Sequence, residues 1–233
     1  MLELELSTLT HDPGPALDVQ RISFAYVPRS PVISDVSLSF DAGTLNCIVG
    51  PSGSGKSTLL YALGGVLPVE GFISVLGSEM PRTAKARAEM RRHHVGYVFQ
   101  RGELLDELTI IQNVALPLRL LDTSKAQAEE AALRALADLG LAEIAHRSPS
   151  QVSGGQAQRA SVARALIHEP AIVLADEPTG SLDGVSRDVV LERLIRAARR
   201  GACVVVATHD VALHERADRT IALMSQHPAP AHP

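Results

Sequence analysis

Residues 50–58 of this chain read Gly50-Pro51-Ser52-Gly53-Ser54-Gly55-Lys56-Ser57-Thr58. The stretch fits G-x-x-x-x-G-K-[ST], the pattern of a phosphate-binding loop, and it lies between an apolar run and a helical segment, as that loop does. Glycines let backbone N–H groups turn toward phosphate oxygens, and the following helix adds the positive end of its dipole. Lys56 is expected to reach the β- and γ-phosphates of a nucleotide, and the Ser57 hydroxyl to ligate Mg²⁺. A flexible glycine–serine turn is the alternative, which the flanking segments disfavour.

A pair of carboxylates ends the apolar run Ile172-Val-Leu-Ala-Asp176-Glu177-Pro178. In open parallel sheets, ligands bind beyond the carboxyl ends of the strands. Asp176 is therefore expected to hold Mg²⁺ through water, and Glu177 to orient and deprotonate the attacking water. An Asp-Glu-Pro sequence alone is as often a solvated turn, but the phosphate loop upstream favours the catalytic interpretation.

Two kinds of strand pattern indicate the fold class. Residues 171–175 and 203–207 are continuous apolar strands separated by a helix at 184–200, which is typical of a parallel sheet covered on both faces. Residues 18–27 and 34–40 alternate apolar and polar side chains, as half-buried antiparallel strands do. The predicted fold is α/β: a phosphate-loop nucleotide hydrolase with a mostly parallel sheet core, an N-terminal antiparallel β-subdomain and an inserted α-helical subdomain.

The other expected elements are strands at 45–49, 72–76 and 95–99, and helical segments at 57–64, 82–94, 104–145 and 151–169. Within 104–145, Ser124 is expected to cap a helix and Gly140 to stop it. The basic segment 82–94 is interpreted as a solvated face, with a binding patch as the alternative. The expected domains are a loose leader at 1–15, a nucleotide-binding domain at 16–225 with a helical subdomain at about 101–165, and a disordered tail at 226–233.

Composition narrows the class of protein. Hydrophobic residues make up 45% and charged residues 21% of the 233 residues, as in ordinary globular domains. The net charge of −4 weighs against nucleic acid as the main partner. The chain has no apolar run near the roughly 18 to 20 residues of a membrane span and no signal-peptide pattern. Cys47 and Cys203 lie in apolar runs and are interpreted as inert core thiols. These features predict a soluble cytoplasmic protein.

A further glycine motif, Val152-Ser153-Gly154-Gly155-Gln156 followed by Gln158-Arg159, lies between the phosphate loop and the acidic strand end. This segment resembles the signature of the ATP-binding-cassette ATPases, in which the three motifs occur in the same order. The resemblance covers about residues 18–223. It implies that the chain binds ATP and Mg²⁺ and hydrolyses the phosphoanhydride bond of ATP.

The resemblance also implies roles for residues that are weak signals alone, because a single tyrosine or histidine is usually structural. It implies that Tyr26 stacks on adenine, that Gln100 senses the γ-phosphate and Mg²⁺, and that His209 contacts the γ-phosphate. It further implies that Ser181-Leu182-Asp183 communicates across a dimer. Tyr26 and His209 stand where the family pattern places them.

The signature has a physical consequence. Ser153 and the backbone N–H groups of Gly154 and Gly155, at a helix start, form a second anion-binding surface, and Gln156 completes the motif. In this family, that surface meets the ATP held by the other subunit's phosphate loop. The resemblance therefore implies that two cassettes close on two ATP molecules and reopen after hydrolysis. A homodimer with two equivalent sites is expected, and a heterodimer with a sister cassette stays open as an alternative.

One branch of the family is similar in the segment that follows Gln100. In the macrolide-export, lipoprotein-release and cell-division cassettes, a leucine pair, a threonine and Asn-Val precede an apolar helix, as at residues 104–118 here. The ending Asp176-Glu-Pro-Thr-Gly-Ser-Leu-Asp183 also fits that branch. Asp106 stands where the group often has proline, and Val152 replaces the usual leucine of the signature.

Three functions follow from these observations. The expected one is the energising subunit of a membrane transporter or extruder, held at the cytoplasmic face of the inner membrane by an integral membrane permease. A regulatory ATPase that drives a membrane protein's shape change without cargo, as in the cell-division branch, is the second. A soluble cassette acting on DNA or ribosomes is the third, and it is disfavoured because such proteins usually carry two cassettes or long coiled coils.

Overall fold

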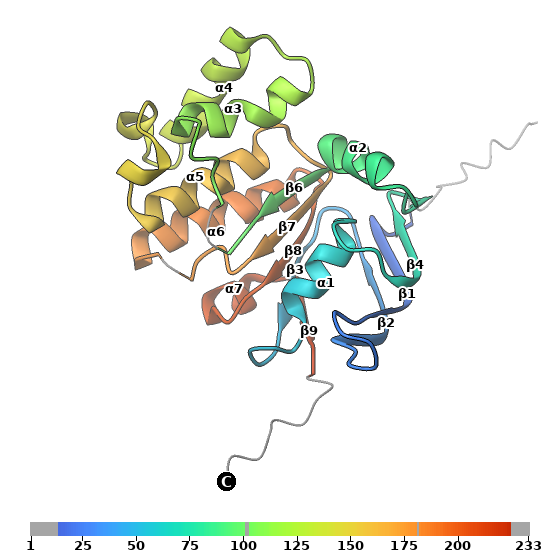
Figure 1. Cartoon of the computed structure of the whole chain (residues 1–233). Coiled ribbons are helices and arrows are strands. Elements are labelled where there is room, and N and C mark those ends of the chain that lie inside the picture. Colours follow the sequence, from blue (N-terminus) through green and yellow to red (C-terminus); the bar gives the residue numbers. More distant parts are fainter. Residues whose placement is uncertain (1–13, 101–102, 181, 225–233) are drawn as a thin grey trace, which may run out of the picture.

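The computed structural model describes residues 14–100, 103–180 and 182–224. The predicted tail at 226–233 and most of the predicted leader at 1–15 lie outside the described residues, as does Ser181. Two sheets and the helices around them make up the described chain (Figure 1). No helix in these ranges has both the length and the apolar character needed to cross a membrane.

The N-terminal sheet has the strand order β2-β1-β4-β5. Its strands are β1 (Leu17–Phe24), β2 (Ile33–Phe40), β4 (Glu70–Val75) and β5 (Ser78–Glu79). β1 pairs antiparallel with both β2 and β4, as its alternating sequence predicts. Along β1, Leu17, Val19 and Ile22 are buried while Gln20 is exposed, so one face of this sheet packs on the core.

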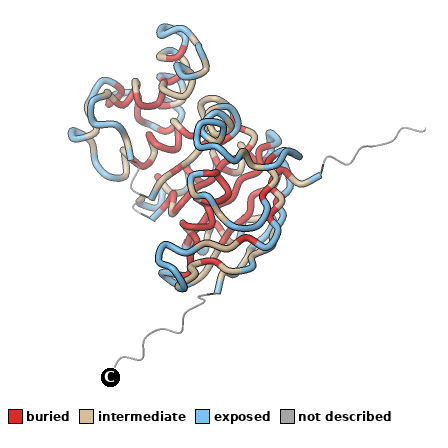
Figure 2. Tube along the Cα trace, turned by 45° about the vertical axis from the view of Figure 1, so that its right-hand side comes forward, coloured by how far each residue is buried: buried red, intermediate tan, exposed pale blue. Residues whose placement is uncertain are grey.

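The central sheet is parallel throughout, with the order β6-β7-β8-β3-β9. Its strands are β3 (Leu45–Val49), β6 (Val95–Val98), β7 (Ile172–Asp176), β8 (Cys203–Ala207) and β9 (Arg219–Ala222). β7 and β8 are fully buried, which explains their continuous apolar sequences. The tube in Figure 2 shows the buried positions concentrated along these strands.

Helices cover both faces of the parallel sheet. α1 (Lys56–Leu63) lies on one face, where Leu60 shares a core with Leu174. α5 (Gly154–Leu166) and α6 (Gly184–Arg199) lie on the other face, where Val162 shares a core with Val173. Because successive residues of β7 point to opposite faces, Leu174 and Val173 place α1 and α5 on opposite sides of one strand. Figure 1 shows α1 apart from the α5–α6 pair.

A third core belongs to the helices between β6 and β7. α3 (Ile110–Leu120) and α4 (Lys125–Ala137) pack with α5 through residues such as Ile110, Ala132 and Ala160. The segment predicted as helical at 104–145 thus contains two helices and the 3₁₀ turn at Ala142–Ile144. Ser124 caps α4 as predicted, accepting a hydrogen bond from the Gln127 N–H.

Two sequence predictions need correction in detail. The helix predicted at 151–169 begins at Gly154, because Ser153 is its N-cap and residues 149–151 form a separate 3₁₀ turn.

The basic helix α2 (Ala84–His94) buries none of its residues, but its face is not only solvated. Arg87 and Arg91 both donate to the carbonyl of Gly65, just beyond the end of α1, and so anchor α2. α7 (Val211–Arg216) and β9 were not predicted.

Candidate functional site

The predicted phosphate loop connects β3 to α1 in the described structure. Gly53 and Gly55 have φ angles of 77° and 94°, which side-chain-bearing residues rarely adopt. At Gly55, a Cβ atom would lie 3.0 Å from the carbonyl oxygen of Val32, so the glycine is also needed for close packing. No side chain caps α1, and its first turn holds no acidic residue. The N–H groups at the start of α1 are therefore suited to an anion.

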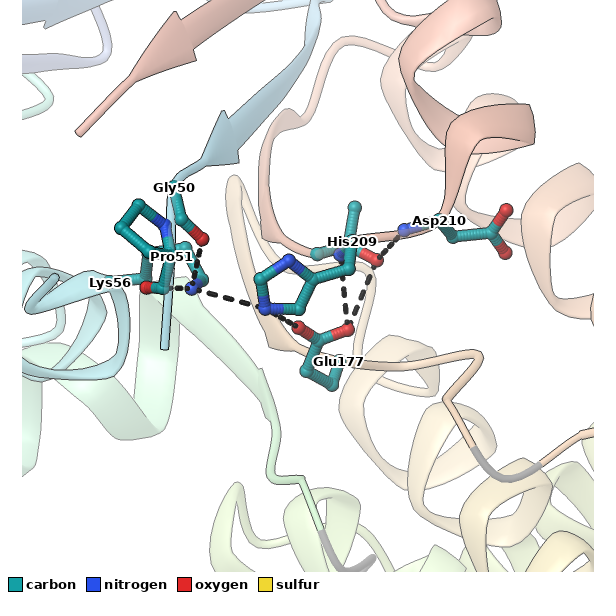
Figure 3. Close-up of polar contacts among 7 residues, drawn as sticks. Gly50, Pro51, Lys56, Glu177, His209 and Asp210 are labelled. Carbon is teal, nitrogen blue, oxygen red and sulfur yellow. Dashed lines mark hydrogen bonds and ion pairs between the residues drawn. The ribbon is translucent and has the colours of Figure 1, made fainter. Parts of the chain in front are cut away.

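Lys56 points back into the loop that precedes it. Its Nζ donates to the carbonyls of Gly50, at 2.9 Å, and Pro51, at 3.1 Å (Figure 3). The same Nζ lies 3.4 Å from Nε2 of His209. Charge-assisted bonds to phosphate oxygens are stronger than bonds to neutral carbonyls, so a phosphate is a better partner for this ammonium group.

Two of the three predicted metal ligands, Ser57 and Asp176, lie close together. Asp176 is buried at the end of β7, and the Ser57 hydroxyl lies close enough to influence its protonation. Burial raises the pKa of Asp176, while Ser57 and the Lys56 charge oppose that shift. The described residues contain no group of three or more His, Cys, Asp and Glu side chains that could hold a metal. One carboxylate and one hydroxyl fit Mg²⁺, which usually keeps waters and shares its coordination with substrate phosphates.

Glu177 has an unusual backbone conformation directly after β7. Its φ of 45° is left-handed, which costs of order 1–3 kcal/mol for a non-glycine residue and is found most often at functional sites. Its Oε2 accepts hydrogen bonds from Thr208 Oγ1, at 3.2 Å, and from the His209 N–H, at 3.3 Å. Its Oε1 lies 3.4 Å from His209 Nε2. Figure 3 shows the His209 ring between Lys56 and Glu177.

Tyr26 lies beside the start of α1, and Gln100 follows β6, the strand next to β7. Tyr26 is 59% exposed, packs edge-on against Phe24, and has its hydroxyl 3.4 Å from Thr58 Oγ1. The ring is thus accessible beside the start of α1, as a base-stacking residue must be. Gln100 is exposed in the turn after β6.

The signature residues are not brought to the phosphate loop of their own chain. Ser153 caps α5 in a capping box: its Oγ accepts from the Gln156 N–H, and the Gln156 side chain accepts from the Ser153 N–H. Ser153 and Gly154 are exposed, so the N-terminus of α5 presents its N–H groups to the surroundings. α5 and α1 cover opposite faces of the sheet, which separates the signature from the phosphates that the chain's own loop would hold.

Asp183 caps the next helix, α6. Its carboxylate accepts from the Ser186 N–H at 2.8 Å, and this bond is the largest of the causes that lower the pKa of Asp183. Arg159 of the signature helix donates to the Ser186 hydroxyl, which in turn donates to Asp183. A bonded path therefore joins α5 to the loop before α6. Ser181, predicted to act with Asp183, lies outside the described residues.

Sequence reasoning assigned no role to three residues that contact the site. Thr208 donates to Glu177, and Thr179 donates from Oγ1 to Asp210 Oδ2 at 2.9 Å. The signal available for them was their position, since Thr208 and Asp210 flank His209 and Thr179 follows the Asp-Glu-Pro run.

Comparison with known proteins agrees with this geometry. A family model described as ABC transporter matches residues 33–180. The "Lipoprotein-releasing system ATP-binding protein LolD" of Novosphingobium aromaticivorans is 42% identical, with the match covering 82% of this chain and 87% of that protein. The chain belongs to the ATP-binding-cassette transporter ATPases. It is an ATP hydrolase, as the resemblance of its motifs predicts.

Two further comparisons extend the likeness. The "Macrolide export ATP-binding/permease protein MacB" of Bradyrhizobium diazoefficiens is 44% identical to this cassette over 82% of the chain. The cassette spans only 30% of that longer relative. A solved structure titled as a dimeric, post-hydrolysis state of the ATP-binding cassette MJ0796 bound to ADP and Pi matches with a TM-score of 0.86 and 31% identity. That match covers 91% of this chain and 97% of the solved one, and it confirms the predicted fold class.

Proposed function

We propose that two copies of this cassette close on two ATP molecules and drive an integral membrane permease subunit as part of a transporter or extruder. The observation that carries the proposal is the separation of two anion-binding surfaces in one chain. The phosphate loop lies with α1 on one face of the sheet, and the Ser153 end of α5 belongs to the other. A symmetric dimer supplies each phosphate loop with the signature of its partner.

In each of the two ATP sites, different side chains have different chemical roles. Lys56 binds the β- and γ-phosphates, because its ammonium group already lies inside the loop. Glu177 takes a proton from the attacking water at Oε1, and His209 holds the γ-phosphate from beside it. Mg²⁺, held by Ser57, by Asp176 and by the phosphates, would neutralise charge on the oxygens of the phosphates. Gln100 would contact the γ-phosphate and Mg²⁺.

Binding of the nucleotide base and closure of the dimer involve residues at the border. The exposed ring of Tyr26 stacks on adenine, and the loop residues 50–55 with Thr58 enclose the phosphates. Ser153, Gly154 and Gly155 face the partner's γ-phosphate. Asp183 lies in the loop that contacts the partner subunit. Its hydrogen-bonded connection to Arg159 through Ser186 couples closure of the dimer to α5, the helix that carries the signature.

The membrane partner is proposed to contact the segment after Gln100. Leu105 and Leu120 are large apolar side chains with 45% and 50% of their surface exposed, on or next to α3. Exposed apolar side chains along this segment could be covered by a helix supplied by another subunit. The names of the lipoprotein-releasing and macrolide export relatives support an export system of this kind. The cassette would thereby be held at the cytoplasmic face of the inner membrane by its partner.

An affinity pull-down tests the membrane assignment. Tagged Glu177→Gln protein is incubated with ATP and detergent-solubilised membranes, and the captured proteins are identified by mass spectrometry. Capture of an integral membrane protein, lost in the Leu105→Glu/Leu120→Glu variant, is expected. Recovery of soluble protein or nucleic acid alone contradicts the proposal. Cargo flux through the reconstituted complex separates a transporter from the second candidate, a regulator that moves no cargo.

A further inference from the structure

The loops that follow β7 and β8 are joined by two hydroxyl–carboxylate hydrogen bonds that run in opposite directions. Thr208, after β8, donates to Glu177 Oε2 at 3.2 Å. Thr179, after β7, donates to Asp210 Oδ2 at 2.9 Å. Both threonines are buried, at 0% and 4% exposure. We call these four residues (Glu177, Thr179, Thr208 and Asp210) the threonine clasp.

The direction of the bond to Glu177 is fixed by the rest of the clasp. The Thr208 oxygen accepts a hydrogen bond from the Asp210 N–H at 3.0 Å. A hydroxyl carries a single proton, so with that lone pair engaged the proton of Thr208 is directed to Glu177. The main chain adds a third link, because the Glu177 N–H donates to the Ala207 carbonyl at 2.8 Å.

Asp210 connects the clasp to the neighbouring helix. Its Oδ1 accepts from the Ala212 N–H at 3.0 Å and so caps α7, while its Oδ2 accepts from Thr179. Thr179, in the loop after β7, is therefore connected through Asp210 to the start of α7. This arrangement restrains the two loops relative to each other.

The two carboxylate oxygens of Glu177 have different contacts. Oε2 accepts from the Thr208 hydroxyl and the His209 N–H. Oε1 has no such restraint from Thr208 and faces the His209 ring on the side of Lys56 (Figure 3). Because the left-handed backbone of Glu177 is intrinsically unfavourable, contacts outside the residue must hold it.

We propose that Thr208, together with the Thr179–Asp210 pair, positions Glu177 for catalysis by holding Oε2 and presenting Oε1 to the attacking water. The inference rests on the proposed role of Glu177 as the general base. A base must come within hydrogen-bond reach of the proton it takes, and a displacement of about 1 Å can cost about 10²-fold in rate. The threonines themselves touch neither water nor phosphate in this account.

Steady-state ATP hydrolysis by the whole chain tests the clasp. Thr208→Val removes the hydroxyl at nearly constant volume and is expected to lower kcat by about 10- to 100-fold, with little change in KM. Thr208→Ser keeps the hydroxyl and should recover most of the loss. Thr179→Val, which removes the second bond, should lower kcat in the same direction. Thr44→Val is the matched control, since it removes a bonded hydroxyl at the opposite end of β3 from the loop.

The Glu177→Gln background distinguishes positioning from general damage. If Thr208 acts only through the Glu177 carboxylate, the double variant Thr208→Val/Glu177→Gln has the same kcat as Glu177→Gln alone. If Thr208→Val causes a general structural defect, its loss of kcat multiplies the loss caused by Glu177→Gln. Wild-type kcat in both Thr208→Val and Thr179→Val, or equal losses for Thr208→Val in both backgrounds, would overturn the clasp. Full turnover by Glu177→Gln alone would instead overturn the proposed base, so the two failures are distinct.

Discussion

Nε2 of His209 lies 3.4 Å from Oε1 of Glu177, so the second residue after β8 faces the carboxylate directly after β7. Neighbouring parallel strands end at the same edge of a sheet, and the register pairs Asp176 with Ala207. The two side chains therefore meet because each follows its strand by one or two residues. This edge is where the proposed hydrolytic chemistry is located.

Glu177→Gln should leave ATP affinity close to wild type and lower turnover by about 10²-fold or more, the scale of losing a general base. Glutamine keeps the size and the hydrogen bond from Thr208 but cannot take a proton from water. Release of phosphate and equilibrium binding of ATP measure the two effects separately. Glu169→Gln, an exposed carboxylate after α5, is the control. An unchanged turnover number would remove Glu177 from the catalytic role.

Lys56→Ala should act on binding itself. A hydrogen bond to a charged group contributes about 1.5–3 kcal/mol, so the Kd for ATP is expected to rise by about 10- to 150-fold. Titration calorimetry with the non-hydrolysing Glu177→Gln background measures the change without turnover. Lys85→Ala, on the exposed surface of α2, should bind ATP as the wild type does. Normal affinity in Lys56→Ala contradicts the phosphate contact.

Asn113 explains the Asn-Val pair, which lies within α3 and not before it as the sequence pattern suggested. Its side chain is fully buried, accepts from the Leu105 N–H at 2.7 Å, and donates toward the carbonyls of Leu105, Leu108 and Thr109. Asn113→Leu removes these part-buried hydrogen bonds, so we expect a loss of about 2–4 kcal/mol in unfolding free energy, from about 0.5–1.5 kcal/mol for each bond. Denaturant unfolding gives the value. Gln20→Leu, exposed on β1, should stay within about 0.5 kcal/mol of wild type.

Asp176 should make stability depend on pH in a specific direction. Burial raises its pKa, so the folded state binds the proton more tightly than the unfolded state. Its contribution to stability therefore falls as the pH rises from the unfolded pKa through the folded one. We expect Asp176→Asn, measured without nucleotide, to melt above wild type at neutral pH, with a difference that shrinks toward acidic pH.

Asp183 is the control, because its pKa is shifted in the opposite direction from that of Asp176. Its pKa is lowered by the Ser186 N–H, so its stabilising contribution is present at neutral pH and lost as the pH falls through the folded pKa. Asp183→Asn should consequently melt at or below wild type at neutral pH. A parallel response of the two variants to pH would contradict the assigned environments.

The sequence motifs predict the site better than they predict its surroundings. Residues 50–58 combine a local pattern with an adjacent apolar strand, so the phosphate loop could be predicted by itself, whereas the interpretation of the carboxylates in 172–178 needed that loop as context. β9 could not, because its residues Arg219–Ala222 are mostly exposed and pair only with β3 at the sheet edge. Its strand character depends on a distant partner, which no local window contains.

The start of α5 and the threonine clasp illustrate two other limits. The pattern Ser153-x-x-Gln156 is that of a capping box and predicts the boundary at Gly154, whereas the predicted range 151–169 also included Gln151 of the preceding 3₁₀ turn. Thr179 and Thr208 lie beside recognised motifs, but nothing local predicts their hydrogen-bond partners, which are 31 positions away in the chain. Only the pairing of β7 with β8 brings each hydroxyl to its carboxylate.

The composite dimer is the central claim, and the mass of Glu177→Gln in solution with and without Mg²⁺ and ATP tests it most directly. Size-exclusion chromatography with light scattering should show a monomer that becomes a dimer with ATP, holding two nucleotides. Adding Ser153→Arg should abolish dimerisation while ATP still binds, whereas Ser124→Arg, which removes the matching cap of α4, should not. A protein that binds ATP and stays monomeric, or that dimerises equally well with Ser153→Arg, would contradict the account.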